Sequence, residues 1–229
     1  MGETSCERGR YTEIKRYGRV DMKLNKGLVF VGVGAVLAGA LLLGAYNAAS
    51  APLPEGFPEP TPDGAIAVKQ YPAYRAATVQ VAGRLADAPS QGFSPLFNHI
   101  SSNDISMTAP VETRYPPATL QPQAVTEGQA TVSFLYRSLD IVPQEIAQDV
   151  QVEDIPPMLV VSLGRRGGYG YDNYADGIEQ LQAWLAEHPE YAVAGSPRRL
   201  FYDGPFVPDF LKRNDIQIPI TRVADRTAP

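Results

Sequence analysis

The spacing of hydrophobic residues changes partway through residues 92–115, which divides this stretch into two elements. Residues 101–104 are polar, and the run from Met107 to Tyr115 passes through Ala109–Pro110, where the residue before proline disfavours helix. The second half is therefore predicted to be extended. The first half carries apolar residues at helical spacing, which predicts a short helix with one apolar stripe. These residues are Phe93, Leu96, Phe97 and Ile100.

Other segments show the alternation or the β-branched and aromatic content of strands. A second helix is predicted over Asn173–Glu187, with Asp172 as its N-cap. Residues 118–128 and 140–157 read as connections. The order strand–helix–strand–strand then occurs twice, which indicates two similar β-α-β-β halves. The predicted strands cover 65–83 (broken near Pro72), 107–115, 129–137, 158–165, 191–202 and 215–223.

Residues 27–46 form a run of twenty residues without a charge. A helix of this length reaches about 30 Å, enough to cross a bilayer. The basic flank lies on its N-terminal side, so residues 1–26 are expected to stay in the cytoplasm as a partly disordered tail. The sequence thus predicts a single-pass protein of the inner membrane with its globular part in the periplasm.

Two alternatives to an anchor remain for this segment. Ala49-Ser50-Ala51 has the small-x-small pattern of a signal-peptide cleavage site, although Pro52 follows it directly. A buried core helix is the other alternative. Met22 opens a typical export-signal start, so the true start of translation could lie there.

The remaining chain divides by composition. Residues 47–64 contain five prolines and are predicted to be a stiff linker that holds a domain off the membrane. Residues 65–223 are expected to form that domain, followed by a tail at 224–229.

Charge and residue counts exclude several classes of function. Residues 1–26 carry seven basic and four acidic residues, and the rest of the chain carries 13 basic and 21 acidic residues. An acidic domain argues against nucleic acid as a partner, because phosphate neutralisation needs clustered Lys and Arg. One cysteine and two histidines exclude a disulfide within the chain and a multi-histidine metal site.

Three parts of the predicted domain carry recognisable motifs. The first strand has a Tyr-Pro-x-Tyr pattern, and segment 202–215 has a closing motif. The stretch 92–115 carries a signature formed by Leu96, Phe97, Ile100, Asn103, Ile105, Met107, Thr108, Pro110 and Val111. With these motifs the chain resembles the SOUL/haem-binding-protein family. It departs from the family pattern in two places: the turn after the helix is short and contains Ser102, and His99 stands in place of an expected tyrosine.

The resemblance implies an α+β fold, namely a distorted antiparallel β-barrel of two pseudo-symmetric β-α-β-β halves flanked by two helices. In this chain one transmembrane helix would precede that fold. The resemblance also implies haem or another tetrapyrrole as the ligand, held in an apolar groove between the halves with cations for the propionates.

Candidate haem contacts follow from that expectation. His99 lies beside the apolar stripe, so it is either an axial iron ligand or a rim histidine hydrogen-bonded to a neighbour. Met107 is either a porphyrin contact or a core methionine. Phe97 of the signature helix is a further candidate contact. Arg165 and Arg166, or Arg198 and Arg199, could pair with propionates or be solvated surface charges.

The sequence contains no recognisable catalytic motif, so an enzyme is not expected. The leading hypothesis is a membrane-anchored, non-catalytic domain that binds a tetrapyrrole. The alternative is an accessory subunit of a respiratory or photosynthetic membrane complex, which would use the same fold as a docking module without haem.

Overall fold

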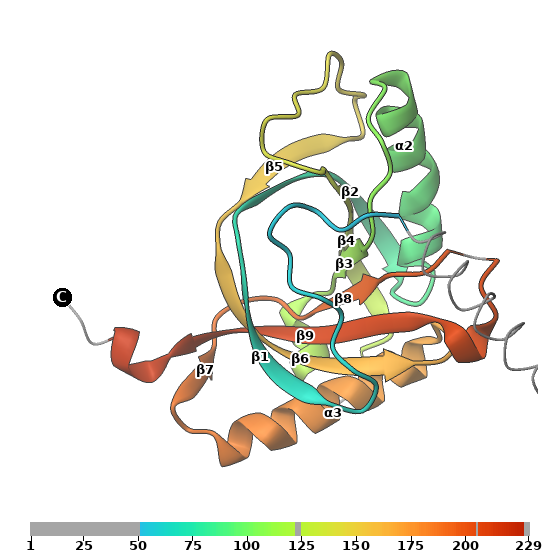
Figure 1. The fold of residues 1–229 in the computed structure, drawn as a ribbon. Helices are drawn as coiled ribbons and strands as arrows, with labels where there is room; N and C mark the ends of the chain where they lie inside the picture. The colour runs from blue at the N-terminus through green and yellow to red at the C-terminus, as the bar shows by residue number, and fades with distance from the viewer. Residues whose placement is uncertain (1–50, 122–124, 205, 227–229) are drawn as a thin grey trace, which may run out of the picture. The chain divides into compact units, whose positions relative to one another are not determined.

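The computed structural model describes residues 51–121, 125–204 and 206–226 (Figure 1). The predicted tail 1–26, the predicted anchor 27–46 and the predicted C-terminal tail from 227 onward lie outside these residues. Within the described part of the chain, no helix combines the length and apolar character that a membrane crossing requires.

The described chain forms one antiparallel sheet with two α-helices. The helices are α2 (Ala88–Ser102) and α3 (Tyr171–Glu187). The strands are β1 (Ile66–Tyr71), β2 (Tyr74–Arg84), β3 (Val111–Arg114), β4 (Glu127–Leu135), β5 (Gln151–Ile155), β6 (Met158–Arg166), β7 (Tyr191–Val193), β8 (Arg198–Phe201) and β9 (Arg213–Arg222).

The same strand pairing occurs twice in the sheet. In the first half β2 pairs with β4 and β4 pairs with β3, and in the second half β6 pairs with β9 and β9 pairs with β8. Antiparallel pairing of β3 with β8 joins the halves. Each helix also carries one glycine against the third strand of its half, Gly92 against Val132 and Gly177 against Ile216. The repeated order seen in the sequence therefore corresponds to a repeated arrangement.

The sheet does not close, so the predicted barrel is corrected to an open sheet. Its strand order begins at β1 and ends at β5. β1 continues into β2 and β5 continues into β6, and the two bent strands pair with each other on both sides of the bend. Pro72 interrupts the first strand, and Pro156 and Pro157 interrupt the second. Because proline cannot donate a ladder hydrogen bond, the pairing breaks at this corner.

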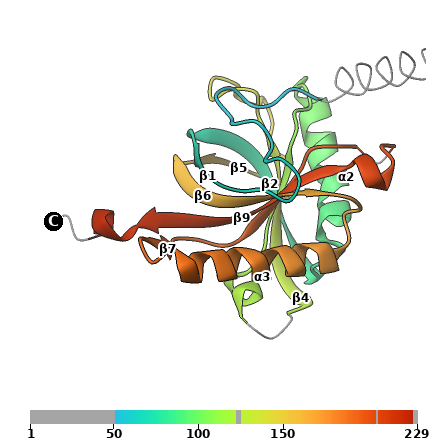
Figure 2. The same ribbon diagram turned by 60° about the horizontal axis from the view of Figure 1, so that its bottom comes forward.

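Both helices lie on one side of the sheet (Figure 2) and share a single core with it. Leu96 and Ile100 of α2 are buried there, as are Ile178 and Leu181 of α3. The predicted stripe on α2 is only half correct. Phe93 and Phe97 are 40% and 48% exposed, and their rings stack on each other.

The opposite side of the sheet is partly covered by residues 51–63, drawn in blue in Figure 1. The ring of Phe57 packs edge-on against Tyr71 and Tyr74, at centroid distances of 5.0 and 5.1 Å. The backbone N–H of Thr61 donates to both carboxylate oxygens of Asp215. These residues were predicted to belong to a linker, but they pack as part of the domain, and we call residues 51–63 the strap.

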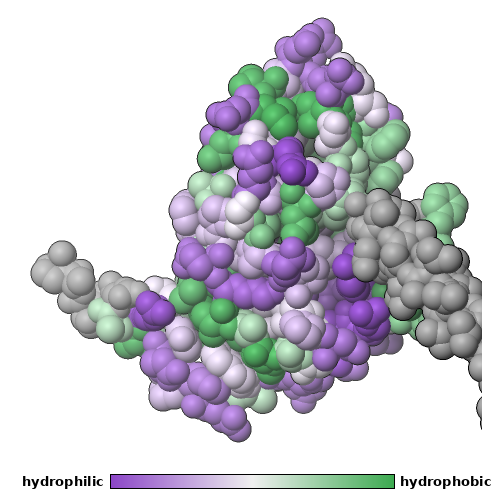
Figure 3. All heavy atoms as spheres, viewed as in Figure 1, coloured by the Kyte–Doolittle hydropathy of each residue, from purple (hydrophilic) through white to green (hydrophobic). Residues whose placement is uncertain are grey.

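Over the face shown in Figure 3, hydrophobic and hydrophilic residues are interspersed.

Several boundaries differ from those predicted. β5 lies inside the predicted connection 140–157, and the predicted strand 191–202 is divided into β7 and β8. β3 covers only the last part of the predicted strand 107–115. Gly170, not Asp172, is the N-cap of α3, and Asp172 lies in the first turn, where its charge favours the helix dipole.

Candidate functional site

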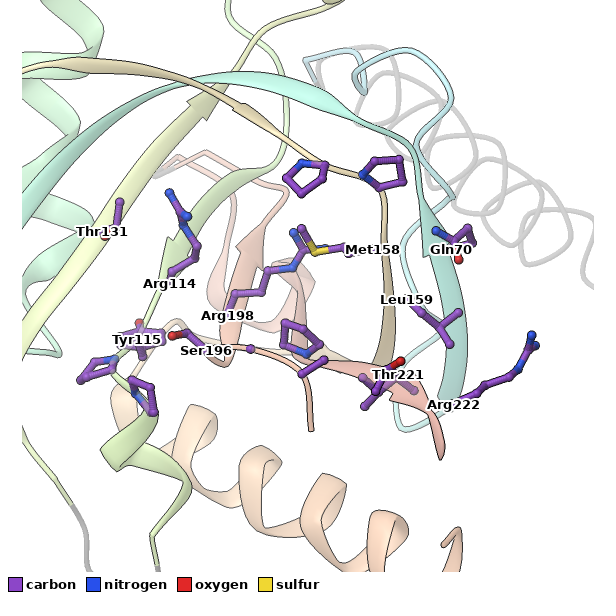
Figure 4. Close-up of a pocket in the computed structure, with 18 of the residues that line it drawn as sticks. Gln70, Arg114, Tyr115, Thr131, Met158, Leu159, Ser196, Arg198, Thr221 and Arg222 are labelled. Carbon is purple, nitrogen blue, oxygen red and sulfur yellow. The ribbon is translucent and has the colours of Figure 1, made fainter. Parts of the chain in front are cut away.

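A groove of about 1020 Å³ lies between the two halves of the sheet (Figure 4). Residues of β3 and β4 line it from the first half, and residues of β6, β8 and β9 line it from the second half. Small-molecule sites typically occupy about 300–1000 Å³. The groove is therefore large enough for a ligand of substantial size.

The charged residues of the groove are all basic. Arg114, Arg198 and Arg222 line it, and no Asp or Glu is found among the described residues that do so. This contrasts with the chain after residue 26, which has 13 basic and 21 acidic residues. A groove with this lining favours an anionic ligand.

Arg198 lies at the base of the groove in a buried ion pair. Its Nη1 donates to Glu112 Oε2 at 2.8 Å and to the phenolic oxygen of Tyr74 at 2.9 Å. Tyr74 in turn donates to the same Glu112 oxygen at 2.8 Å. Burial, together with the charge of Glu112, raises the pKa of Tyr74 far above its usual value, so its phenol stays protonated.

Apolar residues and prolines form much of the remaining lining. Two proline pairs, Pro116–Pro117 and Pro156–Pro157, lie at the ends of β3 and β5, and Leu159 and Ile220 also contribute. Proline rings hold the backbone in one conformation, so these walls are stiff. Met158 adds a polarisable thioether, which adapts to the shape of a ligand.

The structure places His99 away from this groove. His99 is 2% exposed, and its Nε2 lies 2.8 Å from the phenolic oxygen of Tyr136. Its Nδ1 lies 3.4 Å from the side-chain nitrogen of Asn103. The alternative of a histidine bonded to a neighbour describes this geometry, but the histidine is buried rather than on a rim. Its role as an iron ligand stays a prediction.

The other predicted site residues are also not brought together at the groove. Met107 packs against the core under the helices, and Phe97 is on the outer side of α2. Arg165 and Arg166 line a separate cavity of about 250 Å³ beside strap residues Glu59 and Asp63. Their roles as haem contacts stay predictions as well.

The main groove residues were not singled out from the sequence, apart from Arg198, which was considered, like Arg199, either as a propionate partner or as a solvated surface charge. The second alternative is wrong for both arginines, each of which is 1% exposed, and the first stays a prediction. Glu112 lies on β3 directly after the Met-Thr-Ala-Pro-Val run, and Arg114 follows two residues later. Alternation along β3 was the available signal, because residues two apart on a strand share a face.

Asn103 of the signature motif has a structural role. Its side-chain oxygen accepts hydrogen bonds from the backbone N–H groups of Gln144 and Glu145, and its side-chain nitrogen donates to the carbonyl oxygens of His99 and Glu145. These bonds connect the end of α2 to the segment between β4 and β5.

The donor groups at the groove allow a partial test of haem as a ligand. The three arginines match the carboxylates of a tetrapyrrole, and the apolar walls match its ring. Met158 supplies a sulfur atom of the kind that ligates haem iron. In the part of the chain that the structure describes, no group of three or more His, Cys, Asp or Glu could hold a metal ion directly.

The fold is similar to that of several solved structures. The crystal structure of the EcmrR C-terminal domain has a TM-score of 0.56 and 18% identity, and the match covers 69% of this chain and 98% of that one. The EcmrR–DNA complex in EcmrR-RPo gives a TM-score of 0.57 and 16% identity over 69% of this chain, which spans only 58% of the EcmrR chain. A hydrolase from Listeria innocua gives a TM-score of 0.51 and 9% identity, with 70% and 94% of the two chains covered. At these identities the likeness concerns the fold alone.

A comparison with curated proteins gave no significant match. The family model of the SOUL heme-binding protein, in contrast, matches residues 60–219. The match extends from the end of the strap into the last strand, and the groove residues Ile220, Thr221 and Arg222 lie beyond its end. The chain belongs to the SOUL heme-binding protein family.

Proposed function

We propose that this domain binds haem or another tetrapyrrole in the groove between its halves, without chemically converting it. The observation that carries the proposal is the lining of the groove, in which Arg114, Arg198 and Arg222 occur without any acidic residue among the described lining positions. Membership of a heme-binding family supports the same ligand class.

Such a ligand is an aromatic ring system with carboxylates, and the groove offers a partner for each part. Leu159, Ile220 and the proline pairs would contact the ring, and the arginines would pair with the carboxylates. When haem is bound, its iron would supply redox and ligand-binding chemistry. The sulfur atom of Met158, in the groove lining, would contact the metal.

Titration of the full-length protein in mild detergent with hemin tests the proposal. We expect a shifted Soret band that saturates at a ratio of one hemin to one protein. Ala194→Trp, in the exposed lining between β7 and β8, would fill part of the groove and should weaken binding about tenfold or more.

Ala183→Trp is the matched control, because Ala183 is exposed on α3 and does not line the groove. It should bind hemin like the wild type. Absence of any Soret change at micromolar hemin would rule out haem, and equal binding by both tryptophan variants would rule out this groove.

We further propose that residues 27–46 anchor the protein in the inner membrane, with the domain in the periplasm. The support is the charge-free run of twenty residues with basic residues before it. Membranes washed with alkaline carbonate should retain the protein, and added protease should reach the domain only after the outer membrane is opened. Release by carbonate would count against the anchor.

Purification in mild detergent would reveal a stable partner complex, if the domain serves as an accessory subunit.

A further inference from the structure

The guanidinium of Arg198 is buried and has one nitrogen without a partner. Nε donates to the side-chain oxygen of Gln217 at 2.9 Å, and Nη1 donates to Tyr74 and Glu112. The ring of Tyr71 lies 4.7 Å from the guanidinium carbon. Nη2, however, has no hydrogen-bond partner among the described residues. A charged donor left unpaired in the interior is costly, so an acceptor is expected here when the groove is occupied.

Glutamates orient the guanidinium groups of Arg198 and Arg114, but these glutamates do not themselves face the groove. Glu112 lies between two guanidinium groups, with Oε2 at 2.8 Å from Arg198 Nη1 and Oε1 at 3.4 Å from Arg114 Nε. On its far side Arg114 pairs with Glu153 at 3.1 Å. Neither glutamate lines the groove, whereas both arginines do.

The neighbouring residue shows that a free nitrogen alone is not informative. Arg199 is equally buried, and its Nη2 also has no hydrogen-bond partner in the described chain. Successive residues of a strand point to opposite faces, so Arg199 lies on the helix side, where Nη1 donates to the carbonyl oxygens of Tyr169 and Gly170. Arg199 does not line the groove. Of these two neighbours, Arg198 combines the unpartnered nitrogen with a position on the groove, and Arg114, which also lines the groove, has Nε without a hydrogen-bond partner.

We propose that Nη2 of Arg198, together with Arg114, forms a carboxylate-binding subsite that fixes one acidic side chain of the bound tetrapyrrole. Glu112 is the positioning residue, because its two oxygens orient both guanidinium groups. In Figure 4 the side chains of Arg114 and Arg198 extend from β3 and β8 into the space that the walls enclose. The subsite selects ligands by their carboxylates, and this inference rests on the proposed function.

The experiment compares protoporphyrin with its dimethyl ester, which has the same ring but no carboxylate. Each is titrated into the full-length protein in the same detergent, and binding is followed by porphyrin fluorescence. We expect the diacid to bind about tenfold or more tightly than the ester, because a charge-assisted hydrogen bond in a buried site has an effect of this order. Equal affinity of the two ligands would overturn the subsite, whereas binding of neither would contradict the proposed function itself.

Arg198→Lys tests the residue directly, since lysine keeps the charge beside Glu112 but cannot present a second nitrogen. It should weaken binding of the diacid about tenfold and leave binding of the ester unchanged. Arg199→Lys, on the opposite face, should change neither affinity. Equal losses for diacid and ester in Arg198→Lys would show a merely structural role. If this variant does not fold, as judged by circular dichroism, the comparison of diacid and ester on the wild type still decides.

Discussion

The imidazole of His99 and the phenol of Tyr136 are joined edge to edge by a 2.8 Å hydrogen bond, and their ring planes are 12° apart. His99 belongs to α2 and Tyr136 directly follows β4, so the pair fixes the end of the helix on the sheet. The two hydrogens of the Asn103 amide are directed at the carbonyl oxygens of His99 and Glu145, so Nδ1 of His99 is not assigned as an acceptor by this contact. In the bond between Nε2 and the Tyr136 hydroxyl, either atom can be the donor.

Removing the hydroxyl of Tyr136 should destabilise the domain. Tyr136→Phe keeps the aromatic ring but leaves Nε2 of a buried histidine without its hydrogen-bond partner. We expect the free energy of unfolding to fall by about 1–3 kcal/mol, the usual cost of an unsatisfied buried polar group. Urea unfolding of wild type and variant measures this, and an unchanged midpoint would show that water replaces the hydroxyl.

The stability of the domain should also depend on pH through His99. Burial lowers the pKa of His99 in the folded protein. Below the ordinary histidine pKa of about 6.5, the unfolded chain therefore binds a proton that the folded protein resists. The contribution of neutral His99 to stability is complete above about pH 6.5 and declines as the pH falls through the lowered value.

His99→Gln removes the titrating group, and its amide can still donate toward Tyr136. We expect melting temperatures between about pH 7.5 and pH 5 to fall less steeply for this variant than for the wild type. Identical slopes would show that other groups cause the pH dependence.

The same variant tests whether His99 ligates haem. Because His99 is buried and is not part of the groove lining, we expect His99→Gln to bind hemin with the spectrum and affinity of the wild type. A loss of affinity, or a changed Soret maximum, would instead support the ligand role that the sequence suggested.

Elements with strong local patterns could be predicted from the sequence, and elements stabilised by distant contacts could not. The β-branched run of β6 and the helical stripe of α3 lie where their spacing indicated them. β5 was missed because Gln151–Ile155 contains three polar residues and is recognised only through its pairing with β2. The strap was taken for a linker because its prolines resemble a spacer, while Phe57 finds its partners only in the folded sheet.

The candidate site was harder to predict, because its main residues come from separate strands. Glu112 and Arg198 are 86 positions apart, and neither has a local sequence signal for its partner. The double arginine 198–199 resembled a surface charge pair, yet on a buried strand its members point to opposite faces and both need internal partners. The location of a groove between two halves followed from the repeated pattern, whereas its basic lining did not.

The strap should contribute measurably to stability through Phe57. Phe57→Ala removes the ring that packs against Tyr71 and Tyr74, and we expect the free energy of unfolding to fall by about 1–3 kcal/mol. Phe206→Ala is the control, since Phe206 is 98% exposed and should change stability little. Urea unfolding of the full-length protein compares them. Equal midpoints for the two variants would mean that the strap does not stabilise the sheet.

The two helix glycines should respond differently to the same substitution. A Cβ at Gly92 would lie 2.5 Å from Cβ of Val132, with both methyl groups of that valine also too close, so no rotation of Val132 relieves the clash. At Gly177 the nearest atom is the terminal methyl of Ile216, which can rotate away. Replacing glycine by alanine within a helix otherwise gains about 1 kcal/mol. We therefore expect Gly92→Ala to lose about 1–3 kcal/mol of unfolding free energy and Gly177→Ala to stay close to the wild type.

Gly204→Ala serves as the reference for this comparison, because its Cβ would meet no described atom within 4 Å. Urea midpoints of the three variants rank the effects, and the slope of each unfolding curve confirms that the folded state is retained. A Gly92→Ala variant as stable as Gly204→Ala would mean that α2 can move away from β4 at little cost. In that case the close approach of α2 to the sheet would not be what positions the first half of the groove.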